Sequence, residues 1–220
     1  MKIVAVSDIH CKWQKVKIPE CDLLISCGDY SFKGEPWVVK DYHKWLNKQP
    51  AKHIISVNGN HELWVEKNFN EAKMIATEAC PAVHFVEEGL VEIEGIKIWC
   101  SSYTPEFFDW AYNVPRGAEM KKHWDRIPDD VNILAIHGPP YKTLDELVYV
   151  DGTPKGEFVG CADLPNRIKE LKDLDLVFFG HIHANGNQEI HLNGVSYYNV
   201  SICDEMYYPS NPPRIVEYER

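Results

Sequence analysis

The sequence contains no pair of cysteines at metal-binding or disulfide-framework spacing, although seven cysteines occur among its 220 residues. It also lacks an apolar run as long as a membrane span, and its first residues do not form a charged and then apolar leader. An odd number of cysteines without paired spacing is typical of reduced and mostly buried thiols. From these absences we expect a cytoplasmic protein without a membrane partner.

Positive charge is scarce as well, since 23 Lys and Arg stand against 33 Asp and Glu and leave a formal net charge of -10. Such a surface repels the phosphates of nucleic acid, so we expect no duplex nucleic acid partner. Bound divalent cations would offset part of this charge locally. A hydrophobic content of 45% and a charged content of 25% are those of a globular protein with a sizeable core.

Short apolar runs alternate with helical patterns in the first half of the chain. Strands are predicted at residues 2–6, 21–27 and 53–57, and helices at 35–48 and 70–79. Strand signals dominate later. The later predictions are a hairpin at 90–100, a strand at 132–136, a helix at 162–172, a strand at 176–179, and strand-like segments at 188–192, 195–200 and 215–219.

This order of elements indicates the α/β class with a mixed sheet arrangement, in a single domain over residues 1–220. Residues 101–128 are rich in aromatic side chains and interrupted by prolines, so we expect a small insert there, with one short helix near 117–126. Residues 141–160 are predicted as a long polar loop, a feature that is usually functional or mobile.

Five predicted strands end in side chains that bind metal ions. Ligands of open α/β sheets lie beyond the carboxyl ends of the strands, so we expect these side chains to meet. Each one alone has an ordinary structural explanation, such as a helix cap or a surface histidine, but the set would need five coincidences. The set comprises Asp8, His10, Asp29, Asn60, His61, His137, His181 and His183.

Nitrogen and oxygen ligands without thiolates favour Mn, Fe, Zn, Co or Ni over a cysteine-based zinc site, and manganese is our first expectation. The set is too large for one ion, and Asp29 can bridge two ions about 3.5–4 Å apart, as in two-metal hydrolases. Such a pair polarises a phosphoryl group and lowers the pKa of a bridging water, whose hydroxide can attack phosphorus in line. Asn60 supplies a neutral oxygen ligand that adds no negative charge beside an anionic substrate.

These motifs together resemble the complete motif set of the calcineurin-like metallophosphoesterases. They are Asp8-x-His10, Gly28-Asp29, Gly59-Asn60-His61-Glu62, His137 and Gly180-His181-x-His183. Over nearly the whole chain the sequence is also similar to the animal metallophosphoesterase-domain-containing (brain-expressed 239) proteins. The segments that carry this narrower resemblance are Asn113-Val114-Pro115-Arg116-Gly117, His137-Gly138-Pro139-Pro140, Gly180-His181-Ile182-His183 and Asn211-Pro212-Pro213.

The resemblance implies a four-layer α/β/β/α sandwich with two mixed sheets and a pair of divalent metal ions. His61 would contact the phosphate and is a candidate proton donor to the leaving oxygen. Some relatives in the narrower group are weak enzymes with Gly in place of the first His of the last motif, whereas this chain keeps His181. By position, Asp8, His10, Asp29 and His183 would hold one ion, and Asp29, Asn60, His137 and His181 the other.

The sequence departs from the family pattern at Phe32, where many members carry a carboxylate that orients the motif histidine. His61 therefore needs another partner, and Glu62 is the candidate. Outside the ligand set, Arg116 lies between Pro115 and Gly117, and its guanidinium fits either a phosphate clamp or a surface salt bridge.

Several aromatic residues remain open between a substrate-facing role and core packing. Trp110, Tyr112 and Tyr103 could form a wall on which a base stacks, or pack in the core. The weaker candidates are Trp13, Tyr141 and Asn199, and the segment Tyr207-Tyr208-Pro209 is expected to cover a sheet edge.

The first functional hypothesis is a dinuclear phosphoesterase that hydrolyses small phosphodiesters, with 2′,3′- or 3′,5′-cyclic nucleotides implied by the resemblance. Its catalytic residues would be His61 and Asp29, and Asn60, His61 and Arg116 would bind the substrate. A nuclease, or a protein or small-molecule phosphomonoesterase of the same family, is the second hypothesis. A weakly active, nucleotide-binding scaffold protein is the third, and the intact His181 speaks against it.

Overall fold

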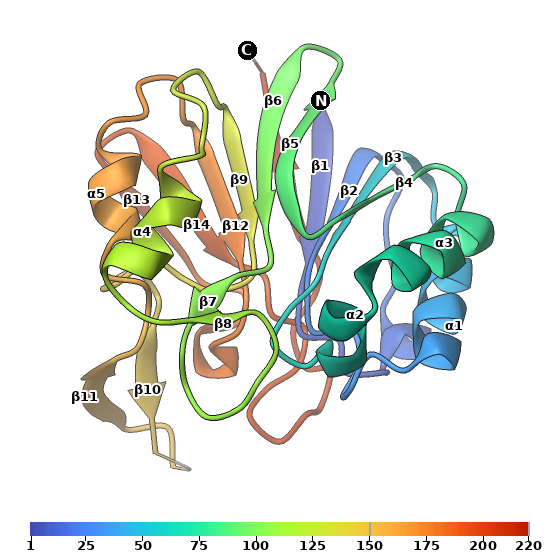
Figure 1. The fold of residues 1–220 in the computed structure, drawn as a ribbon, viewed down its shortest axis with the longest axis horizontal. Helices are drawn as coiled ribbons and strands as arrows, with labels where there is room; N and C mark the ends of the chain where they lie inside the picture. Colours follow the sequence, from blue (N-terminus) through green and yellow to red (C-terminus); the bar gives the residue numbers. More distant parts are fainter. Residues whose placement is uncertain (150, 220) are drawn as a thin grey trace.

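The computed structural model describes residues 1–149 and 151–219, and it forms four layers (Figure 1). Two β-sheets pack face to face, and helices cover the outer face of each sheet. On the first sheet lie α1 (Pro36–Leu46), α2 (Leu63–Lys67) and α3 (Phe69–Ala79), and on the second lie α4 (Ala118–Trp124) and α5 (Leu164–Ile168). The expected α/β/β/α sandwich with two mixed sheets is thereby confirmed.

The first sheet has the strand order β15-β1-β2-β3-β4, and only the edge strand β15 runs antiparallel to its neighbour. Its four parallel strands therefore direct their carboxyl ends to the same edge, where the loops after β1 and β2 begin. The strands are β1 (Lys2–Val6), β2 (Cys21–Cys27), β3 (Ala51–Val57), β4 (Val83–Val86) and β15 (Arg214–Glu217).

The second sheet has the order β13-β14-β12-β9-β6-β5, in which both edge strands are antiparallel and the four inner strands are parallel. A bridge between Ser7 and Ser201 connects the strand ends of the two sheets. The strands are β5 (Glu88–Ile93), β6 (Ile96–Ser101), β9 (Ile133–Ile136), β12 (Leu176–Phe179), β13 (Glu189–Leu192) and β14 (Val195–Asn199).

Smaller elements lie in the loops around the carboxyl ends of the inner strands. The segment expected as an insert holds β7 (Thr104–Pro105) and β8 (Asn113–Val114) before α4. The turn after β12 contains the 3-10 helix η2 (His183–Asn185), and another, η1 (Trp13–Lys15), follows β1. None of the described helices combines the length and the apolar character that crossing a bilayer requires.

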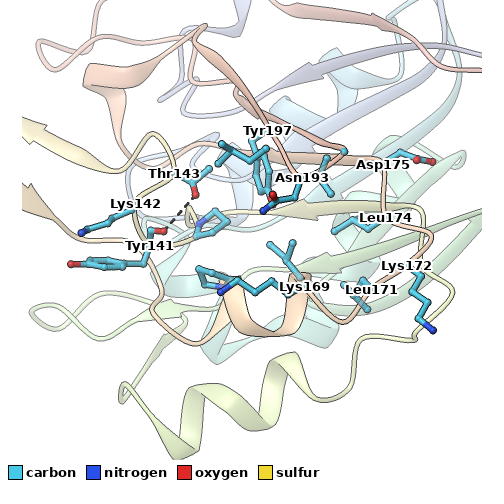
Figure 2. A pocket seen from close by; sticks show the side chains of 16 residues that line it. Tyr141, Lys142, Thr143, Lys169, Leu171, Lys172, Leu174, Asp175, Asn193 and Tyr197 are labelled. Atoms are coloured by element: carbon cyan, nitrogen blue, oxygen red, sulfur yellow. Dashed lines mark hydrogen bonds between the residues drawn. The ribbon is translucent and has the colours of Figure 1, made fainter.

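The expectation of a structureless polar loop at 141–160 is wrong, because β10 (Glu146–Val148) and β11 (Pro154–Phe158) form a hairpin there. Every residue of β11 is exposed, so the hairpin carries no alternating apolar pattern that the sequence could reveal. The start of the same segment, at Tyr141, lines a cavity of about 710 Å³ beside α5 and the β13–β14 turn (Figure 2).

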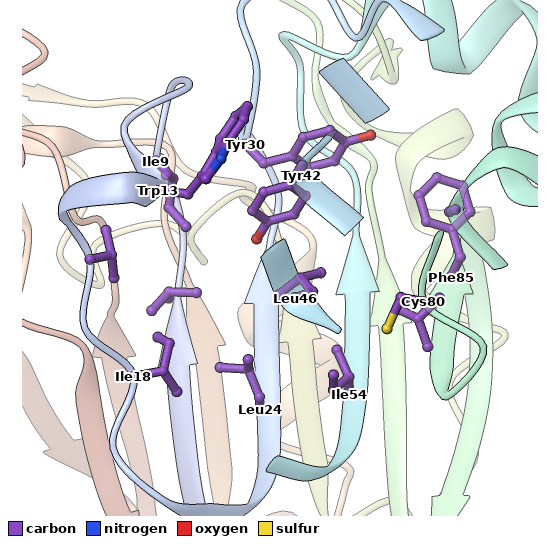
Figure 3. Packing of buried hydrophobic residues seen from close by; sticks show 14 of the residues in the cluster. Ile9, Trp13, Ile18, Leu24, Tyr30, Tyr42, Leu46, Ile54, Cys80 and Phe85 are labelled. Carbon is purple, nitrogen blue, oxygen red and sulfur yellow. The ribbon is translucent and has the colours of Figure 1, made fainter. Parts of the chain in front are cut away.

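Three apolar layers hold the sandwich together. Successive β1 residues alternate between them: Ile3 and Ala5 face the second sheet, whereas Val4 and Val6 face the helices of the first. Because both faces of each sheet are covered, the inner strands β1, β9 and β12 read as continuous apolar runs. Figure 3 shows the layer under α1, where side chains of the helix pack on Leu24 and Ile54.

The remaining differences from the predicted elements are small. The helix expected at 162–172 is shorter, since α5 spans only Leu164–Ile168, and Leu171 and Leu174 are buried in the loop that follows. The short helix α2 and the strand β4 were not predicted. Each has only four or five residues, too few to give a clear periodic signal.

Candidate metal centre

The polar strand ends meet where the two sheets join. The loops after β1 and β2 are held side by side, because the backbone N–H of Asp8 donates to Gly28 at 3.0 Å and that of His10 donates to Asp29 at 3.0 Å. In the second sheet, the N–H of Gly180 donates to the carbonyl of His137 at 3.0 Å. The structure thus brings all of the predicted ligands to one edge of the sandwich.

Asp8, His10 and His183 form the first ligand group. Nε2 of His183 lies 3.3 Å from Oδ1 of Asp8 and 3.1 Å from Nε2 of His10. Nδ1 of His10 contacts the backbone carbonyl of Ser31 at 3.1 Å, and Nδ1 of His183 contacts that of Asp204 at 2.9 Å. With Nδ1–H donating, two Nε2 lone pairs face each other, an arrangement that a shared cation stabilises.

Asp29, His137 and His181 form the second group, together with Asn60. Oδ1 of Asn60 lies 2.8 Å from Nε2 of His137 and 2.8 Å from Nδ1 of His181. Oδ2 of Asp29 lies 3.4 Å from the same His137 nitrogen. Nδ1 of His137 contacts the carbonyl of Cys27 at 2.8 Å, which fixes the ring with Nε2 directed at the group.

Asp29 lies between the two groups, because it also clusters with His10 and His61. Its Oδ1 accepts a hydrogen bond from the backbone N–H of His61 at 2.9 Å, and its Oδ2 faces His137. Its carboxylate therefore lies beside His10 of the first group and His137 of the second.

A buried oxygen of Asp8 provides a test of whether a metal ion fits. Oδ2 of Asp8 accepts hydrogen bonds from the N–H of His181 at 2.9 Å and from Oγ of Ser201 at 2.8 Å. Oδ1 is buried and makes no hydrogen bond in the part of the chain that the structure describes; the nearest polar ring atoms are Nε2 of His183 at 3.3 Å and Nε2 of His10 at 4.0 Å, the other two members of its ligand group. A buried carboxylate oxygen of this kind is costly unless a positive charge meets it, so the donor set fits a metal ion.

Unusual backbone conformations bring the ligands this close. The φ angles of Asp8, His10, Asp29 and His181 are 51°, 44°, 51° and 70°, in the left-handed region that non-glycine residues rarely adopt. The motif glycines are required for space. A Cβ on Gly180 would lie 2.0 Å from Oδ2 of Asp8.

The electrostatics of the site also favour cations. Burial opposes protonation of His137 and His183, yet the carboxylates of Asp29 and Asp8 raise the pKa of each to about 9. Burial lowers the pKa of His10 to about 4 and that of His181 to about 3. The carboxylates therefore recruit positive charge, and bound metal ions would replace the protons on His137 and His183.

His61 finds its partner in the backbone of Phe32, the residue that replaces the usual carboxylate. Nδ1 of His61 lies 3.2 Å from the Phe32 carbonyl oxygen. The expectation that Glu62 is this partner was wrong. Its buried carboxylate accepts hydrogen bonds from the N–H groups of Asp29, Ser31 and Gly59 and from Oγ of Ser31, so it holds the turns that carry the ligands.

A cleft of about 310 Å³ opens over the ligands, and Trp110 and Tyr207 form part of its wall. The Trp110 ring lies 4.4 Å from that of His61 and so stands beside the predicted ligands. Tyr207 was expected at a sheet edge, which was wrong, because its ring lies 4.7 Å from His10 and 5.4 Å from His183. No local sequence signal marks Tyr207, since only the folding back of its turn places it there.

The other candidates lie outside this cleft. Tyr112 is buried and Tyr103 packs against it and against His123, so both favour the packing alternative. Trp13 belongs to the core under α1. Asn199 supports the site from behind, since its Nδ2 donates to the carbonyl of Ile182 at 2.8 Å.

Arg116 is held by backbone carbonyls of a distant loop. Its Nη1 donates to the Gly160 carbonyl at 2.8 Å and its Nη2 to the Val159 carbonyl at 2.6 Å. The guanidinium is therefore engaged with the end of the β10–β11 hairpin, and no salt bridge to it is found among the described residues. The sequence could not reveal this, because the acceptors are backbone atoms of a distant loop.

Comparison with solved structures supports the fold. Phosphopantetheinyl hydrolase from Mycobacterium tuberculosis superposes with a TM-score of 0.62 at 15% sequence identity, covering 98% of this chain and 95% of that one. The protein TT1561 of Thermus thermophilus gives a TM-score of 0.59 at 14% identity, covering 98% and 97%. At this level of identity the likeness concerns the fold alone.

Comparison with known sequences identifies the family. The chain is 32% identical over 237 residues to metallophosphoesterase domain-containing protein 1 from Homo sapiens, and equally to that from Mus musculus. Each alignment covers 98% of this chain and 70% of the relative. The family model for calcineurin-like phosphoesterases matches residues 1–185, which include every predicted metal ligand. The chain therefore belongs to the calcineurin-like phosphoesterase family, whose members are metal-dependent hydrolases of phosphate esters.

Proposed function

We propose that this protein is a dinuclear metal phosphoesterase that hydrolyses small phosphodiesters, with cyclic nucleotides among the candidate substrates. The observation that carries the proposal is the arrangement of the ligands in two groups around Asp29. A single ion would leave one of these groups without a cation. Manganese is the metal that we propose first.

In this proposal, Asp8, His10, Asp29 and His183 hold one ion, and Asp29, Asn60, His137 and His181 hold the other. The bound pair would supply Lewis acidity toward the phosphoryl oxygens and a nucleophile at neutral pH. The chain contributes the geometry. The carbonyls behind His10, His137 and His183 fix their ring orientations before any ion arrives.

His61 is the proposed residue for positioning the phosphate. It lines the cleft beside Asp29, and its Nδ1 is held by the Phe32 carbonyl, so Nε2 is the ring nitrogen left for the substrate. Phe32 replaces the carboxylate that would orient the ring for proton transfer, and Nε2 of His61 lies 3.9 Å from Oδ2 of Asp29, beside the proposed pair of ions. We therefore propose that His61 contributes more to holding a phosphate oxygen than to protonating the leaving group.

The charge of the cleft supports a diester with one negative charge. Its described lining contains neither Lys nor Arg, and Glu205 adds a carboxylate at its edge. A second or third phosphate of a substrate would meet no protein cation here. The same absence of basic residues weighs against a nuclease that follows a polyanionic strand.

A chromogenic assay tests the proposal. Metal-loaded protein should hydrolyse bis(p-nitrophenyl) phosphate with Mn²⁺, lose this activity on chelation, and regain it when Mn²⁺ is restored. Faster hydrolysis of p-nitrophenyl phosphate, the monoester, would instead favour a phosphomonoesterase. If fully metal-loaded protein hydrolyses neither ester, the enzyme proposal is wrong and a binding role replaces it.

We also propose that the protein acts in the cytoplasm on a soluble ester. All seven cysteines are free thiols, and only Cys11 is partly exposed. Free thiols persist in a reducing compartment. Fractionation of cells that produce the protein would test this, and recovery in an oxidising compartment would contradict it.

A further inference from the structure

A second cavity adjoins the metal centre and is almost entirely apolar. Its volume is about 420 Å³, within the range of small-molecule sites. Phe107, Leu147, His181 and Ile182 line both this cavity and the metal cleft, so the two are neighbours. In the following we call it the side cavity. The rest of its lining is Pro105, Phe108, Arg116, Gly138, Pro139, Val159 and Gly160.

We infer that the side cavity binds an apolar substituent of the phosphate ester, of aryl size, while the metal centre holds the phosphate. This inference rests on the proposed function, because it names the class of ester that the same site accepts. Esters of aromatic or branched aliphatic alcohols are favoured, whereas a substituent that carries charge is not.

The first argument for this inference is the apolar chemistry of the cavity wall. Proline, phenylalanine, leucine, isoleucine and valine side chains dominate it, and they gain from covering hydrocarbon. Arg116 is the only charged side chain among the described lining residues other than a histidine, and both of its terminal nitrogens already donate to Val159 and Gly160. The cavity therefore offers little to a phosphate or another charged group.

The second argument is the position of His181 between the metal centre and the side cavity. Its Nδ1 faces Asn60 in the metal centre, and the same ring contacts Phe107 edge-to-face at 5.1 Å. One imidazole thus separates the ligand group from the apolar wall. A substituent on a phosphate held at the metal centre would enter the side cavity past this ring, along the residues that line both spaces.

The third argument is the position of Phe108 at the border of the side cavity. Its side chain is 85% exposed although it borders the side cavity, and its φ of 50° is unusual for a bulky residue. The side-chain amide of Asn113 holds it there, donating to the carbonyls of Phe107 at 2.9 Å and Phe108 at 3.3 Å. An exposed aromatic ring on a strained backbone that is held at a cavity mouth is well placed to cover a bound apolar group.

The remaining walls are fixed as well, so the cavity exists before a ligand arrives. Arg116 fastens the end of the β10–β11 hairpin through its two carbonyl contacts. Asn185, in the η2 turn of His183, donates to the Glu146 carbonyl at 3.0 Å and ties the start of the hairpin to the metal centre. A preformed wall loses little entropy on binding, and the affinity of the ligand gains accordingly.

The test compares the binding of phenylphosphonate and methylphosphonate, which share the same anionic head and are not hydrolysed. Calorimetry on Mn²⁺-loaded protein should give a dissociation constant that is lower for the phenyl compound by about tenfold or more. The reason is that the phenyl ring is removed from water when it enters the side cavity. Phe108→Ala should reduce this ratio to about threefold or less. Phe158→Ala is the matched control, since Phe158 lies on the neighbouring hairpin but lines neither cavity, and it should keep the wild-type ratio.

Equal affinities for the two phosphonates, binding of neither, or an unchanged ratio in Phe108→Ala would overturn the inference. Chelator-sensitive hydrolysis, measured on the same preparation, separates this failure from that of the proposed function. If the protein hydrolyses esters but shows no preference for the phenyl compound, only the assignment of the side cavity is wrong. If the protein prefers the phenyl compound, loses this preference in Phe108→Ala and yet hydrolyses no ester, only the enzyme proposal is wrong.

Discussion

The metal centre and the wall around it are built in different ways. Asp8, His10 and His137 are 0% exposed, and they follow buried strands whose backbone hydrogen bonds set their positions. The wall consists of side chains from distant loops, such as Phe108 at 85% exposure and Tyr207 at 37%. Side-chain contacts to backbone carbonyls, rather than a sheet, hold several parts of it. The difference supports the proposal that the strands position the metal ligands and that the loops select the ester.

The largest effect is expected from Asp29→Asn, which weakens the only residue shared by both ligand groups. Hydrolysis should fall by about 10³-fold, on the scale of lost transition-state electrostatics, and metal content should drop at both positions. Activity assays with metal analysis measure this. The control is Asp41→Asn on α1, an exposed carboxylate that pairs only with Lys44 in the described structure. Two fully bound ions with near-normal activity would break the assignment of Asp29 as the bridge.

His181→Gly tests whether the two ligand groups act separately. Only the group with Asn60 and His137 loses a ligand, so the ion held there should be depleted first, with activity reduced by about 10²-fold. His183→Gly is the reciprocal variant and should deplete the ion beside Asp8 and His10. Metal titrations of both variants distinguish the two positions. Two ions at full occupancy in His181→Gly would contradict this division.

His61→Ala examines the residue that joins the metal centre to its wall. If His61 mainly positions phosphate, kcat/KM should fall by about 10²-fold for both a nitrophenyl ester and an ester with an alkoxide leaving group. Both substrates are measured with wild type and variant. A loss confined to the alkoxide ester would show that His61 is chiefly a proton donor, and that the Phe32 carbonyl suffices to support that role.

The pH dependence of metal binding probes the metal centre alone. In the metal-free protein the pKa values of His137 and His183 are about 9, so below that pH a proton must leave each ring before it can bind metal. Apparent affinity for Mn²⁺ should therefore rise from pH 6 to pH 9, by up to about tenfold per pH unit for each proton displaced, and then level off. Competition titrations against a chelator at fixed ionic strength measure it. Affinity that is constant over this range would contradict the raised pKa values.

The smallest effect is expected from Arg116→Ala, which changes the wall and leaves the metal ligands intact. Without its hydrogen bonds to Val159 and Gly160 the hairpin loosens, so the preference for phenylphosphonate should fall by about threefold, the scale of a hydrogen bond to a charged group shared with solvent. Metal content should stay at the wild-type level. Arg126→Ala, an exposed arginine paired with Glu88, is the control. Loss of metal from Arg116→Ala would show that wall and metal centre are not separable.

The sequence alone determined the inner strands of the two sheets and the set of predicted ligands. Each inner strand is a short run of β-branched and other apolar residues buried on both faces, and its end is marked where polar residues begin. This is local information, and the rule that parallel strands end at a common edge is sufficient to group Asp8, Asp29 and Asn60 at one sheet and His137 and His181 at the other, whereas the packing of the two sheets brings the groups together. The helices α1 and α3 were readable for the same reason, because their apolar spacing and proline signals are local.

Only the tertiary structure decided the contacts between segments that are distant along the chain. The ring of His61 contacts the carbonyl of Phe32, Glu62 accepts hydrogen bonds from the N–H groups of other turns, and Arg116 donates to carbonyls after β11. Tyr207 reaches His10 because the chain returns to β1 after the second sheet is complete. In most of these contacts one partner is a backbone atom, which every residue type supplies equally. The amino-acid sequence therefore carries no signal for them until the fold has placed the two segments side by side.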